Sequence, residues 1–212
     1  MFLRSVLTFA LALATCTAAT GADLINTLDA TQALAGTGLN GFRVSQSFRT
    51  TLVDTIVTDV TLKMFTDATT GTFRISIFDA TGPGDRPGTQ VAQIYSETVD
   101  KLPTGGYTNF HLGGLSVNLS PDRMYYIVAD ATTLNAEDKF VYWQYTDSPP
   151  PGSHGDTSIY WQSFDGSTWQ DEYVGSPQLM RVVAVPEPGT YALAGLGTLV
   201  LGVFGRRQRR KS

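Results

Sequence analysis

Side chains able to carry out chemistry are few in this chain of 212 residues. The sequence contains two histidines, His111 and His154, so the commonest general base and metal ligand in proteins is scarce. His154 lies in a loop-like stretch with Ser153 and Asp156, and functional residues are common in loops. Neighbours in sequence do not make a catalytic triad, because the fold sets triad geometry. We therefore expect a protein that is not an enzyme, and a secreted hydrolase is the least favoured alternative.

Acidic residues are the second group of candidates. Residues 23–185 hold 18 Asp and Glu against 9 Lys and Arg. Among so many acids, some pair will by chance show the spacing of about 5–9.5 Å that glycosidases use. Asp79, Asp85 and Asp156 could offer oxygen ligands to Ca²⁺, but no Asp-x-Asp-x-Asp-Gly loop is present. We expect no metal or cofactor, and an acidic domain also excludes nucleic acid as a partner.

Aromatic residues are the richest local feature. Eight of them fall within 32 residues: Tyr142, Trp143, Tyr145, Tyr160, Trp161, Phe164, Trp169 and Tyr173. Flat apolar rings with polar neighbours suit sugar binding, which makes Trp143, Trp161 and Trp169 candidate residues of a carbohydrate-binding surface. The favoured alternative is structural: strand alternation turns one set of rings into the core, and Phe164 and Trp169 pair across a hairpin.

The C-terminus carries the most specific pattern in the sequence. Val185, Pro186, Glu187 and Pro188 precede an uncharged segment, residues 189–205. Each proline favours extended geometry in the residue before it and removes a backbone donor, so the last strand should end here. A protease would meet an extended peptide. Pro188 and the Glu187 carboxylate then suit the start of a helix.

Residues 189–205 predict a short transmembrane helix. These 17 residues span about 25 Å at 1.5 Å each, the lower limit for a hydrocarbon core of about 30 Å. Residues 206–212 follow as a basic stop, which should stay cytoplasmic and leave the domain facing outward. The basic groups of this stop are Arg206, Arg207, Arg209, Arg210 and Lys211.

Residues 1–22 predict a secretory signal peptide. Arg4 precedes a short apolar run and then mostly small residues, and cleavage after Ala19 or Ala22 fits the small-residue rule. The apolar run is too short to span a membrane. The residues before Cys16 faintly resemble a lipobox, so lipidation is the minor alternative. Cys16 is the single cysteine, and the mature domain can therefore form no internal disulfide.

Signal peptide, domain, Pro-Glu-Pro motif, helix and basic end together resemble the PEP-CTERM sorting system of Gram-negative bacteria. The resemblance implies that the membrane enzyme exosortase recognises the tail, and that Val185 to Pro188 are its substrate. It also implies passage through the secretion machinery, anchoring in the inner membrane before processing, and a final place at the cell surface or in the extracellular matrix. The alternative is a proline-rich linker before an ordinary anchor.

Residues 23–184 predict one mainly β domain, an antiparallel β-sandwich with jelly-roll-like topology. Apolar residues alternate with polar ones at 60–64, 73–77 and 115–119, which is typical of half-buried strands. Further runs lie near 44–52, 91–99, 107–112, 124–129, 140–145, 159–164 and 179–185. This gives about ten strands, with turns at 81–88, 120–122 and 165–167, while residues 23–40 stay unassigned. In the run 107–112, alternation places His111 on the solvated outer face.

The domain also resembles the choice-of-anchor domains that precede such tails. The resemblance lies in the order of four segments: Phe48-Arg49, residues 75–79, Pro87-Gly88 and residues 119–128. That resemblance supports a sandwich and names no ligand. We expect a non-enzymatic surface or matrix protein associated with exopolysaccharide or biofilm, as the sorting resemblance implies. A carbohydrate-binding module is the alternative.

Overall fold

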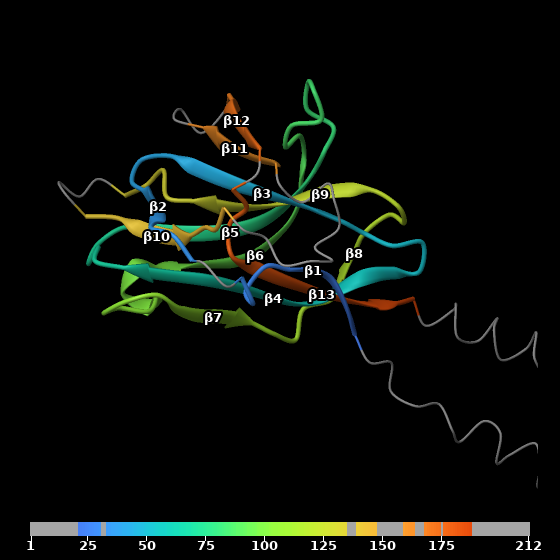
Figure 1. Cartoon of the computed structure of the whole chain (residues 1–212), viewed down its shortest axis with the longest axis horizontal. Coiled ribbons are helices and arrows are strands. Elements are labelled where there is room, and N and C mark those ends of the chain that lie inside the picture. The colour runs from blue at the N-terminus through green and yellow to red at the C-terminus, as the bar shows by residue number, and fades with distance from the viewer. Residues whose placement is uncertain are drawn as a thin grey trace, which may run out of the picture.

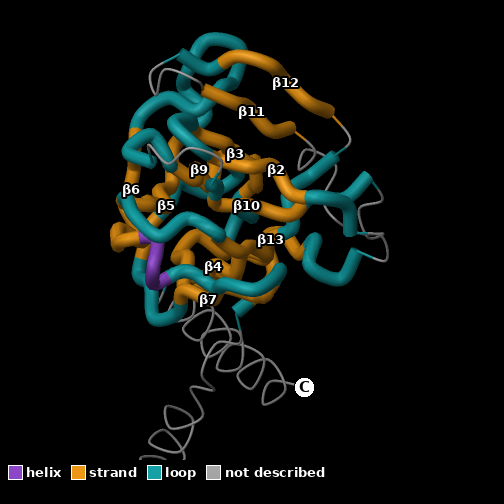
Figure 2. Tube along the Cα trace, turned by 90° about the vertical axis from the view of Figure 1, so that its left-hand side faces the viewer, coloured by secondary structure: helices purple, strands orange, loops and turns teal. Residues whose placement is uncertain are grey.

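Two antiparallel sheets face each other in the computed structural model, which describes residues 21–30, 33–134, 139–147, 159–163, 168–174 and 176–187 (Figures 1 and 2). Sheet A consists of β1 (Ala22–Asn26), β2 (Gly36–Leu39), β4 (Asp54–Thr66), β7 (Thr108–Leu112), β8 (Val117–Asn118), β10 (Val141–Gln144) and β13 (Met180–Pro186). Sheet B consists of β3 (Arg43–Arg49), β5 (Thr72–Asp79), β6 (Gln90–Thr98), β9 (Met124–Asp130), β11 (Ile159–Ser163) and β12 (Gln170–Val174). One turn of 3₁₀ helix, Val99–Lys101, follows β6. The expected mainly β, antiparallel fold is confirmed.

Strand β4, 13 residues long, organises sheet A. Along one edge it pairs with β13 over residues 54–62 and with β10 over residues 64–66. Along the other edge it pairs with β7 and β8. Strand β1 extends the sheet beyond β13, and β2 extends it beyond β10. Sheet B runs in the order β12-β11-β3-β9-β5-β6.

The core fills the space between the sheets, and β4 shows why its sequence forms this element. Val60, Leu62 and Met64 are fully buried and alternate with half-buried polar residues, as the sequence predicts. The alternation changes phase between Val57 and Val60, where the pairing with β13 skips Thr58. A β-bulge of this kind keeps a long, twisted strand facing the core over its whole length.

The outer face of sheet B is covered as well. Tyr126 and Val128 of β9 point away from the main core and form a second cluster with Trp169, against which Phe78 and Ala80 pack. Strand β9 is therefore buried on both faces, which explains why it is apolar from Met124 to Ala129.

Three differences from the predicted strands have clear reasons. Residues 23–40, left unassigned, contain β1 and β2, two short strands that extend the ends of sheet A. The run 115–119 contributes only the two-residue strand β8. No strand is predicted at 170–174, where β12 forms by pairing with β11 at the edge of sheet B. Strand β6, by contrast, forms near the predicted run 91–99, with Ile94 and Tyr95 packed against the core.

The two ends of the described domain lie together. Ala22 at the start of β1 pairs with Ala184 near the end of β13, so both strands reach the same end of the sandwich (Figure 1). The β3–β4 loop lies at this end too, because Asp54 pairs with Pro186. We call this the terminal end.

No helix in the described ranges is long and apolar enough to cross a membrane. The expected helix at 189–205, the basic stop at 206–212 and residues 1–20 of the expected signal peptide lie outside the described residues.

Candidate functional site

The sorting motif begins inside the last strand. Val185 pairs with Ile56 and Pro186 with Asp54, while Glu187 is exposed and follows the strand. Strand β13 ends at Pro186, which confirms the expected end of the last strand; Pro lacks the N–H that would extend the ladder. Because Ala184 is fully buried, a single residue separates the core from the Pro-Glu-Pro motif.

Strand β13 is firmly held up to that point. It lies between β1 and β4 and forms antiparallel pairs with both. Arg181 on its exposed side donates to Asp23 of β1, with a distance of 2.8 Å between Nε and Oδ1. The motif is therefore presented by a rigid strand, and Pro188, its last residue, lies outside the described residues.

The three tryptophans expected to be candidate sugar-binding residues differ in their surroundings. Trp143 is fully buried in the main core, and its indole N–H donates to the carbonyl oxygen of Leu179 at 3.0 Å. Trp169 is 9% exposed and packs in the outer cluster of sheet B. Neither offers an open ring face, because strand alternation and the outer cluster turn both inward. Trp161 lies in β11, and the placement of its side chain is outside what the structure describes.

A different set of rings lies on the outer face of sheet A. Phe65, Tyr107, Phe140 and Tyr142 are each partly exposed and form a continuous series of contacts that we call the aromatic row. Phe65 and Tyr142 are directly opposed on β4 and β10, and their rings stack at 4.5 Å between centroids with an interplanar angle of 10°. Tyr107 meets Phe65 edge-on at 4.7 Å, and Phe140 lies 5.6 Å from Tyr142.

Glycines of β2 make room for this row. A Cβ at Gly38 would lie 3.1 Å from the Phe140 ring, and one at Gly36 would overlap the Tyr107 hydroxyl. The Gly-x-Gly spacing of β2 therefore leaves one face of that strand bare, and the rings lie against its backbone. This spacing, with Phe140 and Tyr142 two residues apart, is the signal in the sequence that could have identified the row.

The row has polar groups along its border. Burial raises the pKa of the Tyr107 hydroxyl, although the Gly36 backbone N–H bonded to it acts in the opposite sense. Burial also raises the pKa of Tyr142, and the Asp67 carboxylate beside it adds to the effect. Asp67 accepts a hydrogen bond from the Phe140 backbone N–H at 2.6 Å as well. The arrangement combines partly exposed rings with phenol and carboxylate groups.

His111 lies on the solvated outer face of β7, as predicted. Its side chain is 59% exposed; Nδ1 is 3.1 Å from Thr61 Oγ1, and Nε2 is 3.5 Å from Asp59 Oδ1. Such exposure leaves the imidazole in contact with water, and Asp59 and Thr61 are its neighbours on the bulged strand β4. His154, Ser153 and Asp156 lie outside the described residues.

Asp79 and Asp85 lie on an open pocket of about 500 Å³ at the terminal end, together with Arg49, Asp122 and Arg123. Asp79 Oδ1 accepts bonds from Thr81 Oγ1 and from the Thr89 N–H, so it closes the β5–β6 loop. Within the ranges that the structure describes, no group of three or more His, Cys, Asp or Glu could hold a metal ion. The Asp79 carboxylate therefore bonds donors of its own loop.

Comparisons with known proteins bear on one segment of the chain. Residues 184–210 match a family model described as the PEP-CTERM protein-sorting motif. The match indicates an exported protein that is sorted and processed through exosortase. No curated protein matches the chain, and no solved structure matches it. The choice-of-anchor resemblance and the jelly-roll-like topology of the sandwich stay predictions.

Proposed function

We propose that this chain is a non-enzymatic cell-surface or extracellular-matrix protein that is displayed through its sorting tail and associates with exopolysaccharide. The tail anchors it in the inner membrane through residues 189–205 until exosortase acts near the motif. The sandwich is the cargo, which the cell delivers to its surface or matrix.

One observation carries this proposal: the matched tail starts at residue 184, the last buried residue of β13. Sandwich and sorting motif are joined by a strand that lies between β1 and β4, with no linker between them. The sorting motif is thus continuous with the fold of the cargo domain, and cleavage after the motif would leave the two sheets whole.

Fractionation of the native host tests the proposal. We expect wild-type protein in the outer or extracellular fraction, and a Pro186→Ala, Pro188→Ala variant retained in the inner membrane. Pro121→Ala, an exposed proline in the β8–β9 turn, is the matched control and should fractionate as wild type. If the double variant also leaves the inner membrane, the Pro-Glu-Pro motif does not direct sorting and the proposal fails.

The aromatic row supports a second candidate function, that of a carbohydrate-binding module. Aromatic rings bury the C–H faces of sugars, and the phenols and Asp67 can bond hydroxyls. The row lies around Thr66, at the end of β4 opposite the terminal end, so it faces away from a membrane-anchored tail. The candidate surface thus passes from Trp143 and Trp169 to Phe65, Tyr107, Phe140 and Tyr142, while Trp161 stays a candidate.

Pull-down with the host's own exopolysaccharide tests this function. Tyr142→Ala should reduce retention on the polysaccharide if the row binds sugar. His111→Ala, on the same face of sheet A but outside the row, is the control and should be retained as wild type. Equal retention of Tyr142→Ala and wild type would exclude the row as a binding surface.

A further inference from the structure

The tip of the β3–β4 loop exposes two adjacent apolar side chains. Leu52 is 77% exposed and Val53 is 45% exposed, and Leu52 is the most exposed large hydrophobic residue in the described part of the chain. Single exposed apolar residues need no explanation, but two at one loop tip form a small protruding patch. We call Leu52 and Val53 the apolar tip.

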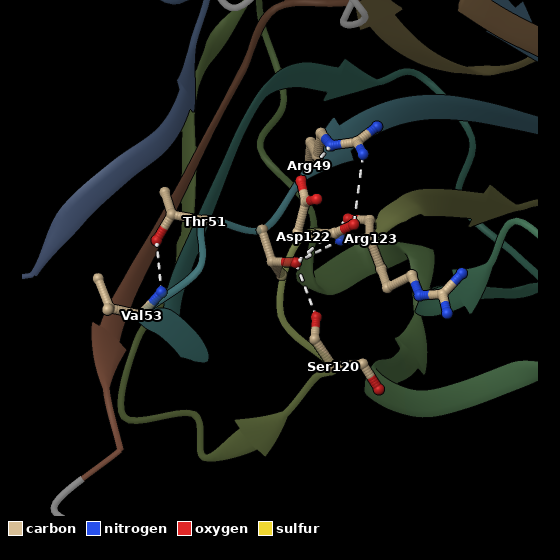
Figure 3. A network of polar contacts seen from close by, with 7 residues as sticks. Arg49, Thr51, Val53, Ser120, Asp122 and Arg123 are labelled. Carbon is tan, nitrogen blue, oxygen red and sulfur yellow. Dashed lines mark hydrogen bonds and ion pairs between the residues drawn. The ribbon is translucent and has the colours of Figure 1, made fainter. Parts of the chain in front are cut away.

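The loop that carries this tip is rigid. Thr51 Oγ1 accepts a bond from the Val53 N–H at 3.2 Å (Figure 3). It also accepts from the Asp54 N–H at 2.7 Å and donates to Asp54 Oδ2 at 2.9 Å. This side chain thereby satisfies two backbone donors of the turn. The exposure of Leu52 is therefore a property of an ordered turn.

A neighbouring turn holds the loop in place. Thr50 Oγ1 donates to the carbonyl oxygen of Ser120 at 2.7 Å and accepts from the Arg123 N–H at 3.0 Å. Arg49 Nε donates to Asp122 Oδ1 at 3.0 Å, which pairs the two charges (Figure 3). The side chain of Arg123 is exposed and has no hydrogen bond or ion pair with the part of the chain that the structure describes. Arg123 is therefore an exposed cation in the turn that adjoins the loop.

The tip lies where the tail leaves the sandwich. Asp54, next to Val53, pairs with Pro186, and only Glu187 and Pro188 separate Pro186 from the uncharged segment at 189. Three residue steps span at most about 11 Å. Each headgroup layer of a bilayer is roughly 5–8 Å thick. A spanning segment at 189–205 would therefore hold Pro186 within about 11 Å of the hydrocarbon core, in the headgroup layer or just outside it.

We propose that the apolar tip inserts into the membrane interface and seats the sandwich on the lipid surface while the tail is in place. This inference rests on the proposed function, in which residues 189–205 span the bilayer. Leu52 and Val53 enter the boundary between headgroups and acyl chains, and the Arg123 guanidinium lies at the phosphates. The charges of Arg49 and Asp122 neutralise each other, and the Asp54 carboxylate accepts a hydrogen bond from Thr51 at the base of the tip.

The consequence is a fixed orientation of the substrate for processing. When the apolar tip is inserted, β13 and the motif lie at a fixed distance from the membrane surface. A protease in the membrane then meets its substrate in one orientation. Two apolar side chains bind a membrane only weakly by themselves. Removal of the tail would therefore release the domain.

Site-specific labelling tests the inference on the full chain. Cys16 is the only cysteine, so a Cys16→Ser background accepts one environment-sensitive fluorophore at an introduced cysteine. One variant carries Leu52→Cys and its matched control carries Thr70→Cys, an exposed position in the β4–β5 loop at the opposite end of the 13-residue strand β4. The probe is a phosphatidylcholine–phosphatidylglycerol vesicle with a quencher on the lipid.

We expect the lipid-borne quencher to remove on the order of half of the emission at position 52 and to leave position 70 unchanged. Equal, weak quenching at both positions in chains that float with the vesicles would overturn the inference. Chains that do not float with vesicles would contradict the membrane-spanning tail, and with it the proposed function. The two failures are thus distinct.

A second experiment tests whether the apolar tip itself binds the membrane or merely lies close to it. A label at Ser120→Cys, in the adjacent turn, reports how close the terminal end lies to the lipid. Leu52→Ser with Val53→Ser changes two exposed side chains and should leave the fold intact. If the tip seats the sandwich, this double change lowers the quenching at position 120 severalfold; unchanged quenching would contradict the proposal.

Discussion

The indole N–H of Trp143 donates a hydrogen bond to the carbonyl oxygen of Leu179, at 3.0 Å between Nε1 and O. The Leu179 N–H in turn donates to the Gln144 carbonyl at 2.7 Å. Trp143 belongs to β10, and Leu179 leads directly into β13, the strand that ends in the sorting motif. The largest fully buried side chain of the described core therefore fixes the entry of the strand that carries the tail.

Replacement of Trp143 should destabilise the domain strongly. Trp143→Ala leaves a large cavity and should lower the free energy of unfolding by about 3–5 kcal/mol. Trp143→Phe keeps most of the apolar volume, but it loses the indole N–H and leaves the Leu179 carbonyl without that donor, so a loss of roughly 1–3 kcal/mol is expected. Urea unfolding measures both. Leu52→Ala, at an exposed position, is the control and should be nearly neutral; an equally mild Trp143→Ala would contradict the core assignment.

The β5–β6 loop should be sensitive to one of its glycines and tolerant at another. A Cβ at Gly88 would lie 2.7 Å from Asp79 Oδ1 and 2.7 Å from the Gly82 nitrogen, inside the bonds that close the loop. Gly88→Ala should therefore cost about 3 kcal/mol, because a backbone nitrogen and a side-chain oxygen that close the loop would both have to move. Gly84 has φ +70° and open space around it, so Gly84→Ala should cost only about 1–2 kcal/mol of backbone strain. Thermal unfolding compares the two, and the reverse order would show that the loop is not closed on Asp79.

Metal ions should leave this loop unaffected. Asp79 already bonds Thr81 and Thr89, and it contributes to no described group of ligands. We expect the same melting temperature with calcium and with a chelator. A rise of several degrees in calcium that disappears in Asp79→Asn would assign an ion to this carboxylate.

The partly buried tyrosines predict a loss of stability in alkali. Burial is the main cause that raises the pKa of Tyr95, Tyr107 and Tyr142 in the folded chain. The unfolded chain then loses its phenol protons first, at a pH near the ordinary pKa of about 10. The stabilisation that these protonated tyrosines give to the folded state is complete below that pH and declines as the pH rises above it.

Phenylalanine variants test this origin. Tyr107→Phe with Tyr142→Phe should flatten the decline of the urea midpoint between about pH 10 and 11.5. Tyr95→Phe should act in the same way without loss at neutral pH, because the buried Tyr95 hydroxyl has no hydrogen-bond partner among the described residues. An alkaline decline as steep in the variants as in wild type would place its cause in other groups.

Period-two alternation predicted most of the core, since Val60, Leu62 and Met64 need only face inward. The same alternation required that either Trp143 or its neighbour Tyr142 be buried, yet it could not say which. That choice depends on β10 pairing with β4 and β2, over distances that no local pattern encodes. The aromatic row depends on the same pairing, because its rings come from three separated parts of the sequence.

Local chemistry predicted the end of β13 correctly, because the effect of Pro186 on a ladder is independent of tertiary context. The apolar tip could not be predicted from sequence. The sequence predicted a strand run as far as Leu52, but β3 ends at Arg49, and only the bonds of Thr50 and Thr51 show that the chain turns there. Exposure at a loop tip is a consequence of the fold.

The most direct test of the sorting tail is the intact mass of the protein recovered from its native host and from a host strain without exosortase. We predict that the wild-type strain yields a chain shortened at both ends, with a C-terminus near residues 185–188, and that the strain without exosortase yields a chain that keeps residues 189–212. Identical masses from the two strains, both with an intact C-terminus, would contradict processing through the Pro-Glu-Pro motif.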